Sequence, residues 1–166
     1  MNQSQDKPFA EENFNVASLE DEIRVDELCR RLLRLFYEEL TQERGLDAEQ
    51  AAALAWGADY FLRDFLIAER QDNLLRISPN RIRQFGGTWY IIKNLEPNLT
   101  ELSSHLRGIA AFYRFLAHRG LISERQAEEL ARPCEELDFY HERIESFWSI
   151  TGDGYPSWER ACSLKD

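Results

Sequence analysis

The segment from Asp138 to Glu145 carries the side chains best suited to metal chemistry. On a helix, Asp138 and His141 would lie three residues apart and His141 and Glu145 four apart, so one face could present all three. Helical di-metal proteins use a Glu-x-x-His pair from each of two helices together with further glutamates. This chain has one such pair, with Asp in place of Glu. Two interpretations stay open, a metal site at Asp138, His141 and Glu145 or an ordinary solvated helix face with local ion pairs, and the spacing alone favours the second.

Other patterns that carry catalysis are missing from the sequence. Ser103 and Ser104 adjoin His105, but they do not form the sharp turn of a nucleophile elbow. Gly86-Gly87 lacks the spacing of either common phosphate-binding loop, and the pair is expected to end a helix instead. The chain is therefore expected not to be an enzyme and to need no cofactor.

Residues 74–120 are basic within an acidic chain. They hold seven cationic side chains and two acidic ones, whereas the whole chain has a net charge of −10. Arg107 and Arg114 are seven residues apart and would share the exposed face of one helix, as in a helix that tracks phosphates. Trp89 and Tyr90 could stack on bases or fill the core. The candidate phosphate contacts are Arg81, Arg83, Lys93, Arg107, Arg114 and Arg119.

The same basic stretch has other possible partners. Charge asymmetry of this kind also suits contact with another protein, with a second copy of the acidic ends, or with those ends folded back in the same chain. Of these possible partners for the basic stretch, we favour a protein over a nucleic acid.

The elements that must position these residues are helices. Apolar residues recur at spacings of three and four, and no stretch reads as a strand, which predicts an all-α fold. Helix starts are expected at Ser18, Asp47, Ser78, Asn98 and Ser123. Gly45 and Gly120 are expected to follow helix ends, and Pro133 to kink or split the helix that contains it.

This pattern divides the chain into three parts. Residues 18–151 are expected to form a single-domain bundle of five to six helices joined by short turns. Residues 1–17 are polar and aperiodic, which indicates a flexible tail pinned by Phe9 or Phe14, and residues 152–166 are expected to be a C-terminal loop.

The helix expected over residues 134–150 has aromatic side chains on several sides. They are more than one helix face can bury, which suggests a subunit interface and a homodimer. The candidate interface residues are Phe139, Tyr140, Phe147 and Trp148.

Residues 47–122 resemble the SAM-like, core-binding helical domain of tyrosine recombinases. The resemblance is carried by Tyr60-Phe61-Leu62-Arg63-Asp64-Phe65-Leu66, by Ile77-Ser78-Pro79 with Ile82-Arg83-Gln84-Phe85, and by the helix from Leu102 to Leu116 followed by Gly120-Leu121-Ile122. It implies a small helical bundle that holds DNA through basic helix faces. It implies no recombinase catalysis, because too few residues follow Gly120 for a catalytic domain and no histidine stands in an H-x-x-R pair.

The composition of the chain indicates in which compartment of the cell the protein is expected. No apolar run approaches the ~18 residues of a membrane-spanning helix, and the first residues do not read as a secretory signal. Three cysteines without paired spacing indicate reduced thiols in a cytoplasmic protein: Cys29, Cys134 and Cys162. We therefore expect a cytoplasmic, non-enzymatic binding or assembly module that associates with itself or with a protein partner. An accessory nucleic-acid-binding protein is the alternative, and a metal-binding helical protein is the third possibility.

Overall fold

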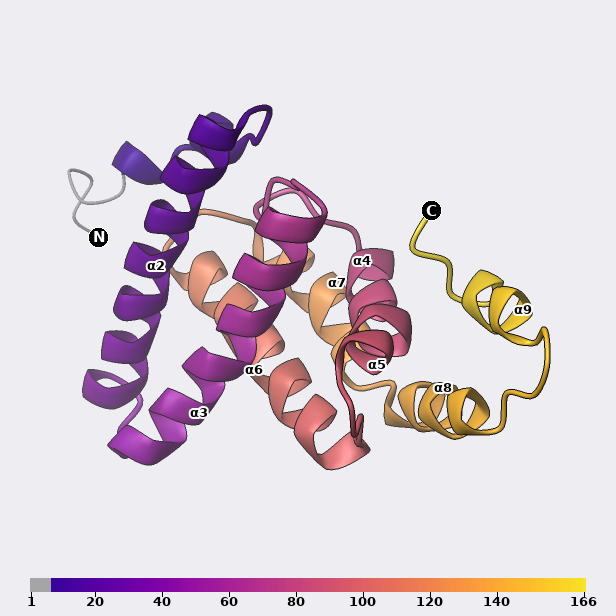
Figure 1. Ribbon diagram of the computed structural model, residues 1–166. Helices are drawn as coiled ribbons and strands as arrows, with labels where there is room; N and C mark the ends of the chain where they lie inside the picture. The colour runs from indigo at the N-terminus through magenta and orange to yellow at the C-terminus, as the bar shows by residue number, and fades with distance from the viewer. Residues whose placement is uncertain (1–6) are drawn as a thin grey trace.

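The computed structural model describes residues 7–166, and every regular element within them is helical (Figure 1). The elements in chain order are η1 (Lys7–Phe9), η2 (Glu11–Phe14), α2 (Leu19–Gln42), α3 (Ala48–Asp59), η3 (Tyr60–Glu69), α4 (Pro79–Gln84), η4 (Phe85–Trp89), α5 (Tyr90–Lys93), α6 (Leu99–His118), α7 (Glu124–Cys134), α8 (Leu137–Trp148) and α9 (Tyr155–Arg160). The prediction of an all-α fold is confirmed. Counted as continuous rods, the described residues form seven helices, six of them substantial.

The expected helix starts are confirmed by their caps. Ser18, Asp47, Asn98 and Ser123 each accept a hydrogen bond from the backbone N–H three residues later, at 2.8 to 3.1 Å. Each of these contacts satisfies a backbone donor that the first turn of a helix leaves without an intrahelical partner. Ser78 makes no such bond, and α4 begins instead with Pro79 in its first turn.

Three of the four expected helix breaks are confirmed, at Gly45, Gly120 and Pro133. Gly45 follows the end of α2 with a φ of 69°. Gly120 follows α6 with a φ of 75°, a left-handed conformation that glycine adopts without strain. Pro133 lies in the last turn of α7, and a new helix begins at Leu137, so the proline separates α7 from α8.

The expectation that Gly86-Gly87 ends a helix is wrong. The rod continues through both glycines as η4, a π-helical stretch, and then as α5. A Cβ on Gly86 would lie 2.7 Å from a ring carbon of Tyr140, and one on Gly87 would lie 3.1 Å from the Cys162 sulfur. The glycines are there because α8 and the C-terminal segment pack directly on this backbone.

The core is rich in aromatic rings where η3 meets η4. Phe61, Phe65, Phe85 and Trp89 contact one another with ring centroids 5.1 to 5.9 Å apart. All four are at most 5% exposed. Trp89 is therefore a core residue and is not available to stack on bases.

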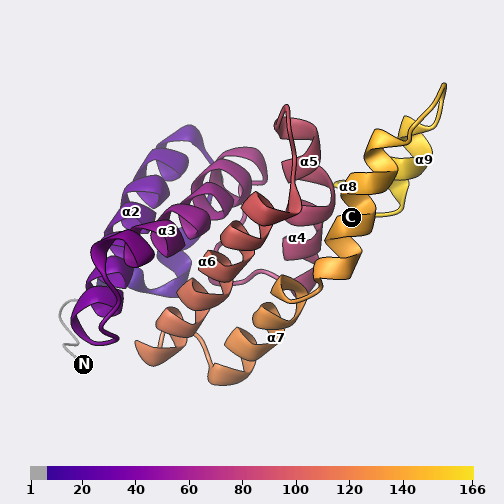
Figure 2. The ribbon, with the colours of Figure 1, turned by 90° about the horizontal axis from the view of Figure 1, so that it is seen from below.

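The helices α3 and α6 cross with their backbones in contact (Figures 1 and 2). An ideal Cβ on Gly108 would lie 2.4 Å from the carbonyl oxygen of Leu54, and one on Gly57 would lie 2.8 Å from that of Ser104. Real Cβ atoms do not approach backbone this closely, so only glycine fits at either position. The two glycines therefore fix how closely α3 and α6 approach and at which residues they cross.

Residues 7–17 are packed, in contrast to the flexible tail that the sequence predicted. Phe9 and Phe14 are 1% and 0% exposed, their rings lie 6.4 Å apart, and Arg31 of α2 lies over the Phe9 ring. The expected pinning by these two phenylalanines is present, and it holds both short 3-10 turns. Residues 1–6 of the predicted tail lie outside the described part of the chain.

The C-terminal segment contains a helix, α9, where the sequence predicted a loop. Its Trp158 is 7% exposed and stacks on the guanidinium of Arg143, 3.9 Å from the ring centroid. Arg143 donates hydrogen bonds to the carbonyl oxygens of Gly87 and Trp158, both at 2.7 Å, and to the Thr88 hydroxyl at 2.9 Å. One buried cation therefore joins η4, α8 and α9, at the end of the molecule away from α2 (Figures 1 and 2).

The crossing of α3 and α6 generates a stability prediction. On helix propensity alone, Gly108→Ala would stabilise α6 by about 0.5–1 kcal/mol. Because the added methyl meets backbone atoms that cannot turn away, we expect the opposite, a loss of about 2 kcal/mol in the free energy of unfolding measured by urea denaturation. Ser103→Ala, a half-buried position on the same helix, is the control and should change stability little. A Gly108→Ala protein as stable as wild type would contradict the close crossing.

Candidate functional site

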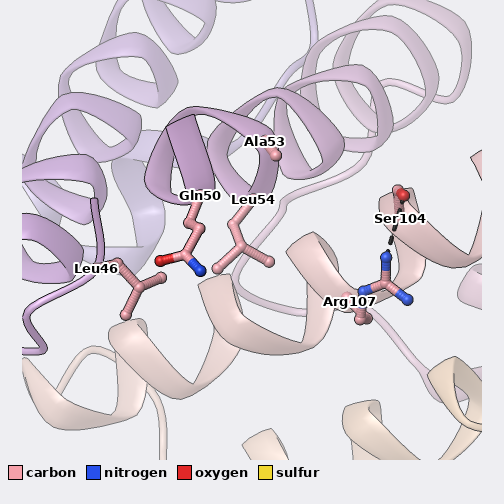
Figure 3. A pocket seen from close by; sticks show the side chains of 6 residues that line it. All are labelled: Leu46, Gln50, Ala53, Leu54, Ser104 and Arg107. Carbon is pink, nitrogen blue, oxygen red and sulfur yellow. Dashed lines mark hydrogen bonds between the residues drawn. The ribbon is translucent and has the colours of Figure 1, made fainter. Parts of the chain in front are cut away.

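A groove runs between the first turns of α3 and the middle of α6 (Figure 3). Its volume is about 530 Å³. Leu46, Ala53 and Leu54 supply apolar surface, and Gln50, Ser104 and Arg107 supply polar groups. An apolar surface with a few polar groups is the usual composition of a binding site.

Arg107 is the only charged residue that lines the groove within the described chain. Its side chain is exposed and Nη2 donates to the Ser104 hydroxyl at 3.2 Å, while no carboxylate of residues 7–166 pairs with it. This cation is therefore available to an acidic group from outside the chain.

An exposed tryptophan borders the groove. Trp56 follows Ala53 by three residues on α3 and is 58% exposed. Its ring lies 4.7 Å from that of His105, the neighbour of Ser104 in the groove wall. Trp56 was not among the residues predicted from the sequence. The signal was available, since Trp56 falls outside the apolar stripe of its own helix.

His105 supports Trp56 from beneath. The imidazole is 1% exposed, contacts the ring of Tyr60 at 5.0 Å, and places Nδ1 3.2 Å from the carbonyl oxygen of Gly57. Burial lowers its pKa below the ordinary value, and the Gly57 contact opposes that shift. The histidine is thus a packed, neutral part of the α3–α6 crossing.

The candidate phosphate contacts do not form one row. Arg81 pairs with Asp72 at 2.7 Å and Arg83 with Glu136 at 2.6 Å. The bond from Arg83 also lowers the pKa of Glu136. These two cations therefore neutralise acidic groups of the same chain, one of the alternatives left open by the sequence.

The other four cations lie at the end of α5 and on α6 or just after it. Arg107 and Arg114 are both exposed on α6, as their spacing predicted, and Lys93 is exposed at the end of α5. Arg119 packs over the ring of Phe115, 5.8 Å from its centroid. Tyr90, a candidate for base stacking, is fully buried and donates its hydroxyl to Glu101 at 3.0 Å.

The three candidate metal ligands lie exposed along α8. They are Asp138, His141 and Glu145. Across residues 7–166, no group of three or more His, Cys, Asp or Glu side chains is placed to hold a metal ion. The solvated helix face is the interpretation that agrees with this arrangement.

The four candidate interface aromatics of α8 point in different directions. Tyr140 is fully buried and donates its hydroxyl to the Pro133 carbonyl oxygen at 2.8 Å. Phe139 lies against Gly87, and Phe147 packs on Trp158 with ring centroids 5.1 Å apart. Trp148, in contrast, is 59% exposed. The surplus of aromatics on this helix is therefore largely absorbed within the chain.

The cysteines are buried thiols without a disulfide: Cys29, Cys134 and Cys162. Burial raises the pKa of all three, that of Cys134 to about 12. Since the thiolate is the nucleophile, these side chains are poorly suited to attack a substrate.

The setting of His105 gives a pH prediction. Its pKa is lower in the folded chain than in the unfolded one, so below the ordinary value of about 6.5 the unfolded chain binds a proton that the folded chain does not. The stability that depends on the neutral imidazole is complete above that pH and is lost as the pH falls below it. We expect wild type to lose up to about 1.4 kcal/mol more than His105→Gln between pH 7.5 and pH 5.5.

Urea denaturation at the two pH values measures this difference. His141→Gln removes an imidazole that is exposed on α8 and is the matched control for the loss of a histidine. If His105→Gln keeps the wild-type dependence, the buried imidazole does not govern acid stability.

Comparison with known proteins adds no assignment to this geometry. No family model, curated protein or solved structure matches the chain at a significant level. Across residues 7–166, no helix is long and apolar enough to cross a bilayer. The function must therefore be argued from the groove and its surroundings.

Proposed function

We propose that the chain is a non-enzymatic binding and assembly module that associates with itself through the α3–α6 groove and Trp56. The observation that carries the proposal is an exposed tryptophan beside an apolar groove whose arginine has no carboxylate partner among the described residues. Tryptophan and arginine are the side chains most enriched among residues that dominate binding energy at protein interfaces.

The polar groups near the groove support binding over catalysis. The hydroxyls of Ser103 and Ser104 both donate to the Thr100 carbonyl oxygen, at 2.9 and 3.3 Å. The neighbouring His105 is buried under Trp56 and contacts Gly57, so it is not placed as a base for either serine.

Nucleic-acid binding is the second candidate, and one observation favours it. Arg107 and Arg114 are exposed on the same helix, as expected of the recombinase-like domain that the sequence resembles. The internal pairing of Arg81 and Arg83 leaves fewer cations for phosphates, which is why protein binding comes first.

Self-association is tested by sedimentation equilibrium over a range of protein concentrations. Wild type is expected to associate, and Trp56→Ala and Arg107→Glu should each weaken association at least tenfold, about 1.4 kcal/mol or more. Trp148→Ala is the matched control, because it removes an equally exposed tryptophan from α8. If Trp148→Ala weakens association and Trp56→Ala does not, the interface lies on α8. A wild-type protein that stays monomeric at high concentration contradicts self-association.

The nucleic-acid alternative is tested by fluorescence anisotropy with labelled single- and double-stranded DNA. If it holds, affinity should fall by orders of magnitude between ~50 and ~200 mM salt, and Arg107→Glu with Arg114→Glu should abolish binding. The Arg81→Glu change is a poor probe, because it also breaks the ion pair between Arg81 and Asp72. Absence of binding at the lower salt concentration rejects this alternative.

A further inference from the structure

A second exposed apolar patch lies at the start of α2. Leu19 and Ile23 are 71% and 65% exposed, and their spacing of four places them on one face of the helix. They line a hollow of about 390 Å³ together with Ile67 and Ala68 of the η3 end and with charged side chains. Two of these charged side chains are arginines, and both are paired within the chain, Arg30 with Glu27 and Arg63 with Asp26. We refer to Leu19, Glu20, Glu22 and Ile23 as the α2 start.

The α2 start is also acidic. Glu20 and Glu22 flank the two apolar side chains, and neither carboxylate has an ion-pair partner within residues 7–166. Asp21, in contrast, accepts from the Ala17 N–H at 3.0 Å and faces Arg24. Two large apolar side chains and two uncompensated carboxylates are thus presented on adjoining turns.

The α2 start and the α3–α6 groove are complementary in chemistry. The groove offers apolar surface from Leu46, Ala53 and Leu54 and one cation, Arg107, without a carboxylate. Both surfaces are apolar, and their charges are opposite, which is the arrangement that steers and orients protein partners.

The two surfaces of one chain cannot meet each other. The groove begins just beyond the last turn of α2, where the Leu46 N–H donates to the Leu40 carbonyl oxygen at 3.0 Å. The 24 residues of α2 place its start about 36 Å away, and Figure 1 shows the start of α2 and the start of α3 at opposite ends of that helix.

We infer that the α2 start of one copy docks in the α3–α6 groove of a second copy. This inference rests on the proposed self-association and specifies its geometry. Leu19 and Ile23 cover the apolar groove residues, and Glu20 or Glu22 pairs with Arg107. Each copy then offers one groove and one α2 start, so the contact is head-to-tail and builds a ring or an open chain.

Like-to-like pairing is disfavoured by charge. Two grooves facing each other would oppose one Arg107 to another. Two α2 starts would oppose Glu20 and Glu22 to the same carboxylates of the second copy, since Arg30 and Arg63 nearby are already paired within their own chain. Such juxtapositions cost free energy at an interface, whereas the head-to-tail pairing brings opposite charges together.

A complementation experiment tests the geometry. Arg107→Glu damages the groove and keeps the α2 start, whereas the double variant Leu19→Ser, Ile23→Ser damages the α2 start and keeps the groove. All three positions are exposed, so the variants should fold, which circular dichroism verifies. Each variant alone should associate at least tenfold more weakly than wild type. Leu95→Ser, at a 95% exposed leucine in the loop before α6, is the control and should associate as wild type does.

The decisive sample is an equimolar mixture of the two variants, with a fluorescent label on one. One intact groove and one intact α2 start remain in each pair, so sedimentation velocity should show 1:1 dimers that grow no further. A mixture that stays monomeric while wild type associates overturns the head-to-tail pairing and leaves self-association standing.

Two other outcomes also reject the pairing. If Arg107→Glu weakens association but the double variant does not, the groove takes a different segment of the second copy. If wild type does not associate at all, this inference and the proposed self-association fail together.

Discussion

The contact of α3 with α6 at Gly57 and Gly108 is the constraint on which the rest of the structure depends. With no side chain between them, the two backbones touch, and this sets where the groove wall of α6 lies relative to that of α3. The same contact places His105 against the Gly57 carbonyl oxygen and under Trp56. Close packing of this kind transmits any change of volume, because protein interiors have few voids to absorb it. The shape of the groove between α3 and α6 is therefore set by two glycines that do not line it.

Features encoded by a few neighbouring residues could be predicted from the sequence. The caps at Ser18, Asp47, Asn98 and Ser123 depend on a side chain and a backbone group three residues away. The apolar stripes of the long helices depend on the same short spacing. The role of Gly86 and Gly87 could not be read in this way, since the reason for them is the approach of Tyr140 and Cys162 from more than 50 residues later. The groove likewise combines two helices separated by some 50 residues, so no local pattern marks it.

The distribution of charge along the sequence does not predict the distribution of charge on the folded surface. The basic stretch over residues 74–120 suggested a continuous cationic face, yet Arg76 bonds to Glu11, Arg81 to Asp72 and Arg83 to Glu136. Folding brings acidic groups from both flanks to these arginines. Arg107 and Arg114 remain exposed on α6, so the exposed cationic surface is smaller than the basic stretch suggested. The net charge of −10 then lies over other parts of the surface, including the start of α2.

The buried guanidinium of Arg143 has a consequence for how the chain tolerates proteolytic clipping. It is 6% exposed and its bonded partners are neutral oxygens, one of them contributed by Trp158 beyond the loop at residues 149–154. Arginine keeps its charge in proteins, so if the chain is cut in that loop and the fragment dissociates, the cation loses the Trp158 ring and carbonyl oxygen. The free-energy cost of the poorly solvated cation would destabilise the contact between η4 and α8, which remain in the larger fragment. Loss of the C-terminal fragment would thus weaken the packing of α8 on η4.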